Sequence, residues 1–224
     1  MKLKHWLRYL VTHDTTWHGE FKALRPLLIP AKEVERVVVD VGANDGFYSS
    51  NSYPFIRRGW RAVLIEPHPG AFARASKLHA GNGKVVVLNL ACGNKPEKMP
   101  LLLFEGDDGG SQSTLSTHEG QVHTDRAISR RMVVEVESLE KILDQQRVPL
   151  AFGLLSVDSE GHDYQIIQGL NLAKYQPRVI ITEDCPKREL KFHYLVKHGY
   201  HLHQRLQADT IWTRFPVTAA LTGG

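Results

Sequence analysis

Glycines and carboxylates follow the first strongly apolar run of the chain, in the stretch VVVDVGANDGFYSS at residues 37–50. The apolar run predicts a buried strand, so the loop GANDG at residues 42–46 lies beyond the carboxyl end of that strand, where open parallel sheets bind their ligands. Glycine allows the backbone to approach a ligand closely. The spacing is G-x-x-x-G, which differs from the G-x-G-x-x-G of a dinucleotide-binding turn.

The acids around this loop indicate the charge of its ligand. Asp40 precedes the loop and Asp45 lies within it. An opposite charge about 4 Å away is worth about 4 kcal/mol at an effective dielectric constant of 20, before desolvation, and a diphosphate is penalised by a similar amount. The loop therefore favours S-adenosylmethionine, which carries an ammonium and a sulfonium, over NAD. An NAD-dependent oxidoreductase remains the weaker alternative.

A second acid follows the second apolar run, in RAVLIEPHP at residues 61–69. Glu66 lies 66 − 46 = 20 residues beyond Gly46, and an acid at about this distance commonly accepts hydrogen bonds from ribose hydroxyls. Pro67 fixes the chain directly after it. A solvated glutamate at a strand end is the alternative interpretation.

The apolar runs alternate with helical patterns, which predicts an α/β fold. Near-continuous runs of Val, Ile and Leu are typical of parallel strands covered on both faces. We therefore expect a doubly wound, mostly parallel sheet with helices on both faces. Residues 200–214 have room only for a tight turn between two strands, which predicts an antiparallel hairpin at the sheet edge. The predicted strands are 36–41, 61–66, 84–90, 152–158 and 177–183, and the predicted helices include 69–80 and 187–197.

The length of 224 residues fits one domain with additions. We expect a helical extension at 1–33, in which Trp6 to Leu10 form an amphipathic helix, then the main domain at 34–215 and a tail at 216–224. Residues 94–131 interrupt the alternation and are rich in Gly, Asp and Ser, which predicts an insert or lid. Within and after it, 99–104 is expected to be a strand and 133–143 a strand followed by a helix.

The amino-acid composition argues against several classes of protein. Hydrophobic residues make up 42% and charged residues 23%, and no apolar run reaches the roughly 18 to 20 residues of a membrane span. Two cysteines are too few for a disulfide scaffold and favour the cytoplasm. The net charge is +4, but basic residues do not interleave with aromatics, so a nucleic-acid partner is not expected.

The chain resembles the FkbM-type methyltransferases in four stretches: VVDVGANDGFYSSNS, GWRAVLIEPHP, VVLNLACGN and LLSVDSEGHDYQIIQGL. They occur in the family's order over residues 36–214, and the fold implied is the Rossmann-like class I methyltransferase fold. Ser156 and Asp163 stand where the family often has Lys and Glu. The resemblance implies that the loop holds the methionine end of S-adenosylmethionine, that Glu66 holds the ribose, and that Ala91 and Cys92 lie near adenine at the end of the third strand. The expected cofactor-binding residues are Asp40, Gly42, Ala43, Asn44, Gly46, Glu66, Pro67, Ala91 and Cys92.

The fourth predicted strand ends in the candidate catalytic residues. Asp158, Glu160 and His162 follow it, beside the expected position of the methyl group. Alignment of the reactants contributes about 7 to 11 kcal/mol and a general base a factor of about 10² to 10⁴. His162 could be that base, because its ordinary pKa leaves much of it neutral near pH 7. Alternatively, His162 covers the start of the next helix and the acids stabilise that helix start.

A Mg²⁺ site is a further expectation at this edge. Glu183 and Asp184 end the fifth predicted strand next to Asp158, and oxygen ligands from neighbouring strand ends suit this ion. Hydrogen bonding to substrate, or plain solvation, is the alternative. The resemblance implies that the acceptor is a hydroxyl oxygen of a sugar or a small natural product. A non-catalytic binding protein that keeps the fold is the rival hypothesis.

Overall fold

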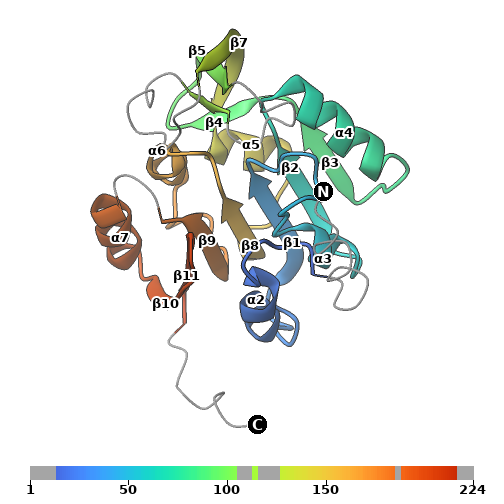
Figure 1. The fold of residues 1–224 in the computed structure, drawn as a ribbon. Coiled ribbons are helices and arrows are strands. Elements are labelled where there is room, and N and C mark those ends of the chain that lie inside the picture. Colours follow the sequence, from blue (N-terminus) through green and yellow to red (C-terminus); the bar gives the residue numbers. More distant parts are fainter. Residues whose placement is uncertain (1–13, 105–112, 116–126, 185–187, 216–224) are drawn as a thin grey trace.

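The structure is a computed structural model that describes residues 14–104, 113–115, 127–184 and 188–215. Within these residues the chain forms a seven-stranded main sheet, a four-stranded second sheet and helices on both sides of the main sheet (Figure 1). The helix expected near Trp6 and the tail at 216–224 lie outside the described residues.

The main sheet has the order β10-β11-β9-β8-β1-β2-β3. Its pairs are parallel except for those of β11, which runs antiparallel to both β9 and β10. The five strands and the edge hairpin expected from the sequence are therefore confirmed. The strands are β1 (Glu35–Val41), β2 (Arg61–Ile65), β3 (Val85–Leu88), β8 (Phe152–Val157), β9 (Val179–Glu183), β10 (His201–Arg205) and β11 (Asp209–Thr213).

The central strands are apolar throughout because helices cover both faces of the sheet. In β1, Val37 and Val39 pack in one apolar cluster, while Val38 between them packs in the cluster on the other face. Val38 and Val39 are both fully buried. This two-sided burial is why the sequence shows a continuous apolar run rather than an alternating one.

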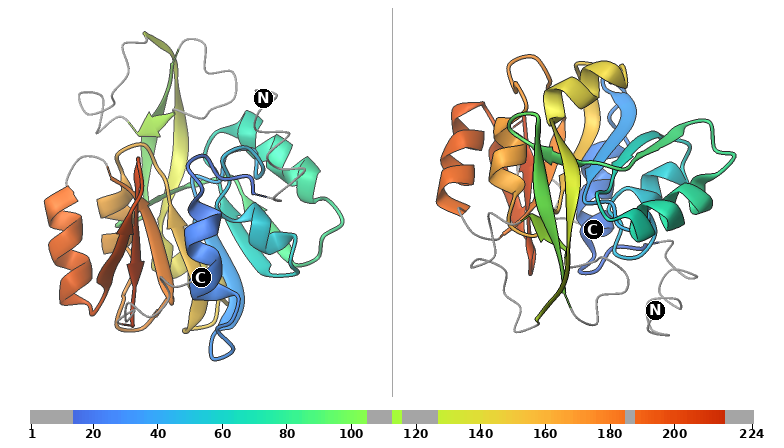
Figure 2. Two further views of the ribbon diagram at one scale, coloured as in Figure 1. Left: turned by 60° about the horizontal axis from the view of Figure 1, so that its bottom comes forward. Right: turned by 90° about the horizontal axis from the view of Figure 1, so that it is seen from above.

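Helices α5, α6 and α7 lie on one face of the main sheet, and α2, α3 and α4 lie on the other (Figure 2). Within the described residues, no helix has the length and apolar character needed to cross a membrane. The helices are α2 (Glu20–Leu28), α3 (Tyr53–Ile56), α4 (Pro69–His79), α5 (Leu139–Gln145), α6 (Asp163–Gln168) and α7 (Arg188–Lys197).

The start of α4 shows how local sequence fixes a helix boundary. Pro69 occupies the first turn, where its missing N–H has no intrahelical role. His68 caps the helix, since its Nδ1 accepts hydrogen bonds from the amides of Gly70 and Ala71, both at 3.1 Å. These contacts confirm the helix expected over 69–80 and fix the chain immediately after Glu66 and Pro67.

The second sheet, with the order β4-β7-β5-β6, lies beyond the carboxyl ends of β1 and β8 (Figure 1). Its own apolar cluster includes Met99, Leu101 and Val134. Much of the segment expected to be a lid or insert is therefore an ordered part of this sheet, while 105–112 and 116–126 lie outside the described residues. The strands are β4 (Ala91–Gly93), β5 (Glu97–Phe104), β6 (Thr114–Leu115) and β7 (Ile128–Ser138).

Candidate active site

The predicted site residues converge at the carboxyl edge of the main sheet. β1 lies between β2 and β8, so the loop after β1, Glu66 after β2 and Asp158 after β8 are neighbours. Strand order reverses here, because β2 and β3 extend to one side of β1 and β8 and β9 to the other. Ligands of open α/β sheets bind at this kind of position.

The glycine loop is held by hydrogen bonds within the protein. The amides of Gly42 and Ala43 donate to the carbonyl of Ile65 at 2.9 and 3.1 Å, and the amide of Gly46 donates to Ala43 at 2.9 Å. The amide of Asn44 donates to Glu66 Oε2 at 2.8 Å. These donors are therefore already committed to protein acceptors. A diphosphate would need such amides to point at it, as they do in a dinucleotide-binding turn.

Gly42 is required for a different reason from the one expected. Its φ is +82°, and a Cβ at this position would lie 1.7 Å from the carbonyl oxygen of Asp158. At Gly46, with φ +73°, a Cβ would lie 3.0 Å from Nε2 of His79. The sequence suggested that these glycines make room for a ligand. In the structure, protein atoms fill the space beside both glycines, because the loop, the end of β8 and helix α4 pack closely together.

Replacing Gly42 by alanine is expected to destabilise the fold by more than about 3 kcal/mol, because the overlap with Asp158 adds to the strain of a positive φ. Gly81→Ala is the matched control: its φ is +86°, but nothing lies within 4 Å of its Cβ position. This control should lose only about 1 to 2 kcal/mol. Equal losses in urea unfolding of the two variants would contradict the close contact.

Asp40 and Asp45, the two acids expected to attract a positively charged ligand, do not stand beside the loop as free carboxylates. Asp45 Oδ1 accepts hydrogen bonds from the amides of Phe47 and Tyr48 at 2.9 and 2.7 Å, so it stabilises the turn. Asp40 is buried, and burial raises its pKa, while hydrogen bonds from Ser52 and Ser156 partly oppose that rise. The preference for a positively charged ligand, which was inferred from these two acids, is therefore weaker than expected. The evidence against a diphosphate comes instead from the loop amides, which already donate to protein acceptors.

Glu66 is a buried carboxylate beneath the loop, with 3% of its surface exposed. Its Oε1 accepts from the amide of His68 at 2.7 Å and its Oε2 from Asn44. Burial raises the pKa of Glu66 to about 7, and the nearby Asp40 adds to the rise, whereas the His68 and Asn44 amides oppose it. Each carboxylate oxygen can accept a further hydrogen bond. Glu66 is therefore placed to join a ligand to the loop.

Asp158 is the centre of a group of acids at the ends of β8 and β9. Solvent reaches it, yet the surrounding protein is dense enough that burial raises its pKa well above the ordinary value. The charge of Glu183 is the next cause, followed by those of Glu160, Asp209 and Asp163. Burial and Glu20 raise the pKa of Asp209 to about 8. The acids around Asp158 are therefore close enough for the ionisation of one to disfavour the ionisation of its neighbours.

Asp163 and Lys191 organise this group, although neither was predicted from the sequence to be a site residue. Asp163 is 1% exposed and accepts hydrogen bonds from Ser159 Oγ at 2.6 Å and from the amide of Glu183 at 3.1 Å. Lys191 is 2% exposed, lies 3.4 Å from Asp163 Oδ2 and donates to the carbonyl of Glu183. A charged residue four positions before the buried Leu195 of α7 was the available signal.

Lys191→Met is expected to destabilise the protein by about 3 to 5 kcal/mol, because it leaves the carboxylate of Asp163 buried without its cation. Lys197→Met, at an exposed position of the same helix, should change stability by less than about 0.5 kcal/mol. Urea unfolding of both variants measures the difference. A similar small change in the two would contradict a structural ion pair at Lys191.

The other predicted catalytic residues lie where the second sheet meets this loop. Glu160 has φ +51°, followed by Gly161 at +100°. Thr114 of β6 is buried and donates to the carbonyl of Glu160 at 2.8 Å. His162 is 6% exposed, and its Nε2 is 3.6 Å from the Cβ position of Gly93 in β4. His162 thus packs against the second sheet, and its side chain makes no capping hydrogen bond at the start of α6.

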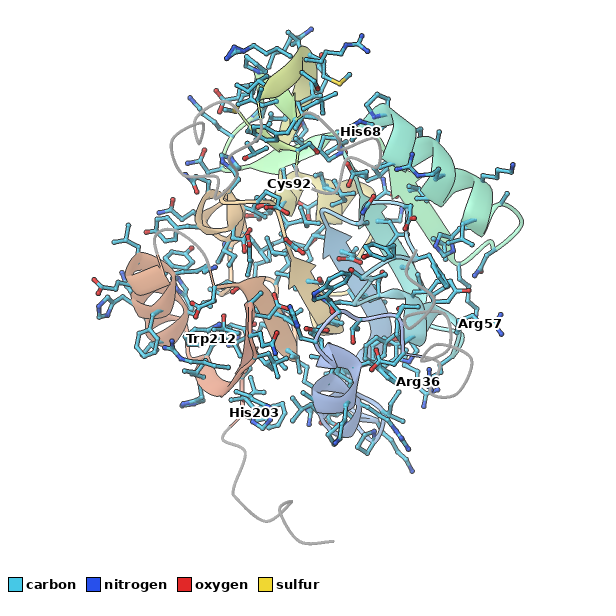
Figure 3. The ribbon with its side chains drawn as sticks, in the orientation of Figure 1. Arg36, Arg57, His68, Cys92, His203 and Trp212 are labelled. Carbon is cyan, nitrogen blue, oxygen red and sulfur yellow. The ribbon has the colours of Figure 1, made fainter. Side chains whose placement is uncertain are left out.

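The resemblance implied that Ala91 and Cys92 lie at the end of the third strand, but in the structure they belong to another strand. β3 ends at Leu88, and the two residues form part of β4, which pairs with β7 in the second sheet. Both are buried, and burial raises the pKa of the Cys92 thiol far above its ordinary value. Figure 3 shows Cys92 and His68 toward the end of the molecule that carries the second sheet, with Arg36 toward the other end.

The metal site suggested by the sequence is not supported. Glu183 is close enough to Asp158 to raise its pKa, but Asp184 forms an ion pair with Arg205 at 3.6 Å. In the part of the chain that the structure describes, no group of three His, Cys, Asp or Glu residues has an arrangement that could hold a metal ion.

The strand order, with antiparallel β11 inserted between β9 and β10, and the acids after β2 and β8 define a protein with the class I methyltransferase fold. The model of the FkbM methyltransferase domain matches residues 40–204, so the chain belongs to that family. This finding confirms the family and the fold expected from the sequence. No curated protein matches the chain.

The chain is similar to several solved structures, of which the first below has a TM-score above 0.5. The FkbM methyltransferase from Methylobacillus flagellatus KT is 14% identical with a TM-score of 0.53, over 95% of this chain and 53% of that one. The chain therefore spans about half the length of that relative. The precorrin-6y C5,15-methyltransferase of Geobacter metallireducens GS-15 is 12% identical (TM-score 0.43, covering 86% and 87% of the chains). The N-terminal domain of human METTL16, solved in complex with SAH, is 13% identical (TM-score 0.39, covering 95% and 69%).

Proposed function

We propose that this chain binds S-adenosylmethionine and transfers its methyl group to a hydroxyl oxygen of a sugar or another small natural product. The observation that carries the proposal is the glycine loop, whose amides are committed to Ile65 and Glu66 rather than free for a diphosphate. The buried carboxylate of Glu66 beside it suits ribose hydroxyls. Membership of the FkbM family supports the reaction, and the resemblance supplies the oxygen and the class of acceptor.

The residues around the loop fit such a cofactor. Glu66 would accept hydrogen bonds from the ribose, whereas the adenine role of Ala91 and Cys92 rests on the family resemblance alone, since both belong to β4 of the second sheet. Asn51 Nδ2 donates to Ser156 Oγ at 3.3 Å, while Asn51 Oδ1 is buried without a hydrogen-bond partner among the described residues. An ammonium group would satisfy this oxygen, with the carboxyl group of Asp40 close to Ser156 as a second attraction.

Asp158 is the residue proposed to accept the proton of the acceptor hydroxyl. When bound, the cofactor supplies a methyl group that its sulfonium has already activated. Asp158 must then orient the hydroxyl and take its proton as the oxygen forms its new bond to carbon. The raised pKa makes its carboxylate a stronger base than an ordinary aspartate. Glu160 and His162 remain the alternative candidates, and each is tested by its own substitution.

Two measurements test this function against its rivals. Calorimetry with S-adenosylmethionine and with S-adenosylhomocysteine should show that both bind, whereas NADH should not. Incubation with methyl-labelled cofactor and a library of sugars and hydroxylated metabolites should then transfer label to a hydroxyl oxygen. Binding without any transfer would favour the non-catalytic binding protein. Tight binding of NADH, with neither methionine compound bound, would overturn the proposal in favour of a dehydrogenase.

A further inference from the structure

A hollow lies among α5, α6 and α7. These helices lie on the face of the main sheet opposite α2 and α4 (Figure 2). The volume of the hollow is about 580 Å³, which is within the range of small-molecule sites. Its walls include residues between Ser138 and Asp144, the segment 168–172 after α6, and Tyr194 and His198 of α7, with Asn94 on another side. None of the residues proposed for methyl transfer lines this hollow.

The charged residues of the hollow are largely satisfied by the protein. Glu140 and Asp144 both form ion pairs with Lys174, at 3.0 and 2.8 Å, and the hydroxyl of Tyr175 donates to Asp144. Lys141 forms an ion pair with Glu137, which is not in the wall. With these pairs formed, the wall carries no excess of positive charge that would attract a phosphate or carboxylate ligand. A ligand for this hollow is therefore expected to carry no negative charge.

Neutral hydrogen-bonding groups remain available in the wall. The side-chain amide of Asn94 and the hydroxyl of Tyr194 line the hollow, and each can both donate and accept a hydrogen bond. Gln168 donates to the hydroxyl of Tyr164 at 3.0 Å, which leaves its amide oxygen as an acceptor. The lining thus offers donors and acceptors together, as a ligand with several hydroxyl groups requires.

The ring of Tyr194 is held in place by its neighbours. Tyr164 lies nearly perpendicular to it at 6.1 Å, and the His198 ring lies 4.3 Å away. His198 Nδ1 lies 2.7 Å from the carbonyl oxygen of Tyr194, which fixes the imidazole beside the ring. A fixed aromatic ring at the wall of a polar hollow gives an apolar surface of limited area. The C–H face of a pyranose ring matches such a surface.

We propose that this hollow is a binding site for a neutral saccharide, separate from the site of methyl transfer. The sugar hydroxyls exchange hydrogen bonds with Asn94 and Gln168, and one ring face lies against Tyr194. Because the charges of the wall are already paired, phosphorylated and acidic sugars find no unpaired cation there, and the polar lining disfavours an apolar ligand. This proposal does not depend on the proposed methyl transfer, because no residue of the hollow takes part in that reaction.

A nuclear magnetic resonance titration of the whole ¹⁵N-labelled chain, without cofactor, tests the site. The probes are maltose, cellobiose, lactose and glucose 6-phosphate. At least one neutral disaccharide should shift the amide signals of 138–144 and 168–172 with a dissociation constant in the millimolar range or below. Glucose 6-phosphate should bind at least threefold more weakly. Shifts confined to other regions, or no shift with any disaccharide, would overturn the proposal.

Substitutions separate this site from a general affinity for sugars. Asn94→Ala and Tyr194→Leu should each weaken the binding of the best disaccharide at least fivefold. Val196→Ser is the matched control, because Val196 is 47% exposed on α7 and is not in the wall. It should bind like the unmodified chain. If Tyr194→Leu unfolds, Asn94→Ala decides, and unchanged binding in that variant would overturn the assignment of the wall.

Discussion

Glu66→Gln should weaken S-adenosylmethionine binding by about 10- to 150-fold, because hydrogen bonds to a charged acceptor are worth about 1.5 to 3 kcal/mol. The oxygen of glutamine can accept from only one of the two amides that Glu66 binds, those of Asn44 and His68, and its NH2 group would face the other. A urea-unfolding curve of the variant must therefore show that the fold is retained, so that the loss can be assigned to cofactor affinity. Calorimetric titration measures it. Glu135→Gln is the matched control: Glu135 is exposed on β7 and pairs with Lys98, so its loss should leave affinity unchanged.

The same residue predicts a pH dependence of cofactor affinity. Because the pKa of Glu66 is raised to about 7, the free protein carries its proton over much of the range below that pH. Ribose hydroxyls donate to the ionised carboxylate, so binding favours loss of the proton. Affinity should fall about tenfold per unit as pH drops below 7 and level off above it. A flat profile in the unmodified chain, or the same slope in Glu66→Gln, would contradict the ribose role.

Asp158→Asn should reduce the rate of methyl transfer by about 10² to 10⁴, the usual contribution of a general base, while cofactor affinity changes by less than about threefold. The asparagine keeps the shape of the side chain but cannot accept the proton. Single-turnover transfer with labelled cofactor measures the rate, and calorimetry measures the affinity. Full activity in this variant would move the base to Glu160 or His162, which Glu160→Gln and His162→Asn then distinguish.

Glu183 offers a second test of the same role without removing the proposed base. After burial, its charge is the largest cause that raises the pKa of Asp158. Glu183→Gln removes that charge, so the pKa of Asp158 should fall and its carboxylate should form at lower pH. The acidic limb of the rate profile should therefore shift to lower pH. A profile that does not move would show that Asp158 is not the titrating group.

The main sheet was predictable from the sequence because its signals are local. Val38 and Val39 are both buried, and a strand buried on two faces shows a continuous apolar run. Pro69 and the His68 cap mark the start of α4, and the short spacing in 200–214 left room only for a hairpin. Such signals depend on neighbours in the chain, so the order of elements and most boundaries could be predicted.

The second sheet and the internal bonds of the site could not be predicted in the same way. Ala91 and Cys92 pair with β7, more than forty residues later in the chain, and Thr114 donates to Glu160 across a similar separation. Nothing in the local pattern specifies these partners. The contact that requires glycine at 42 likewise depends on the carbonyl of Asp158, which the fold brings beside it.

By itself, the sequence determined the family, the parallel sheet and the edge of the sheet at which Asp40, Glu66 and Asp158 lie. It could do so because each of these acids follows directly on an apolar run or ends one, so its position at a strand end can be recognised from neighbouring residues. Only the tertiary structure decided which polar groups are already satisfied. It commits the loop amides to protein acceptors and buries Asp40. It also places Lys191 beside Asp163. The physical reason is that burial and hydrogen bonding depend on atoms from distant segments, which meet only when the chain is folded.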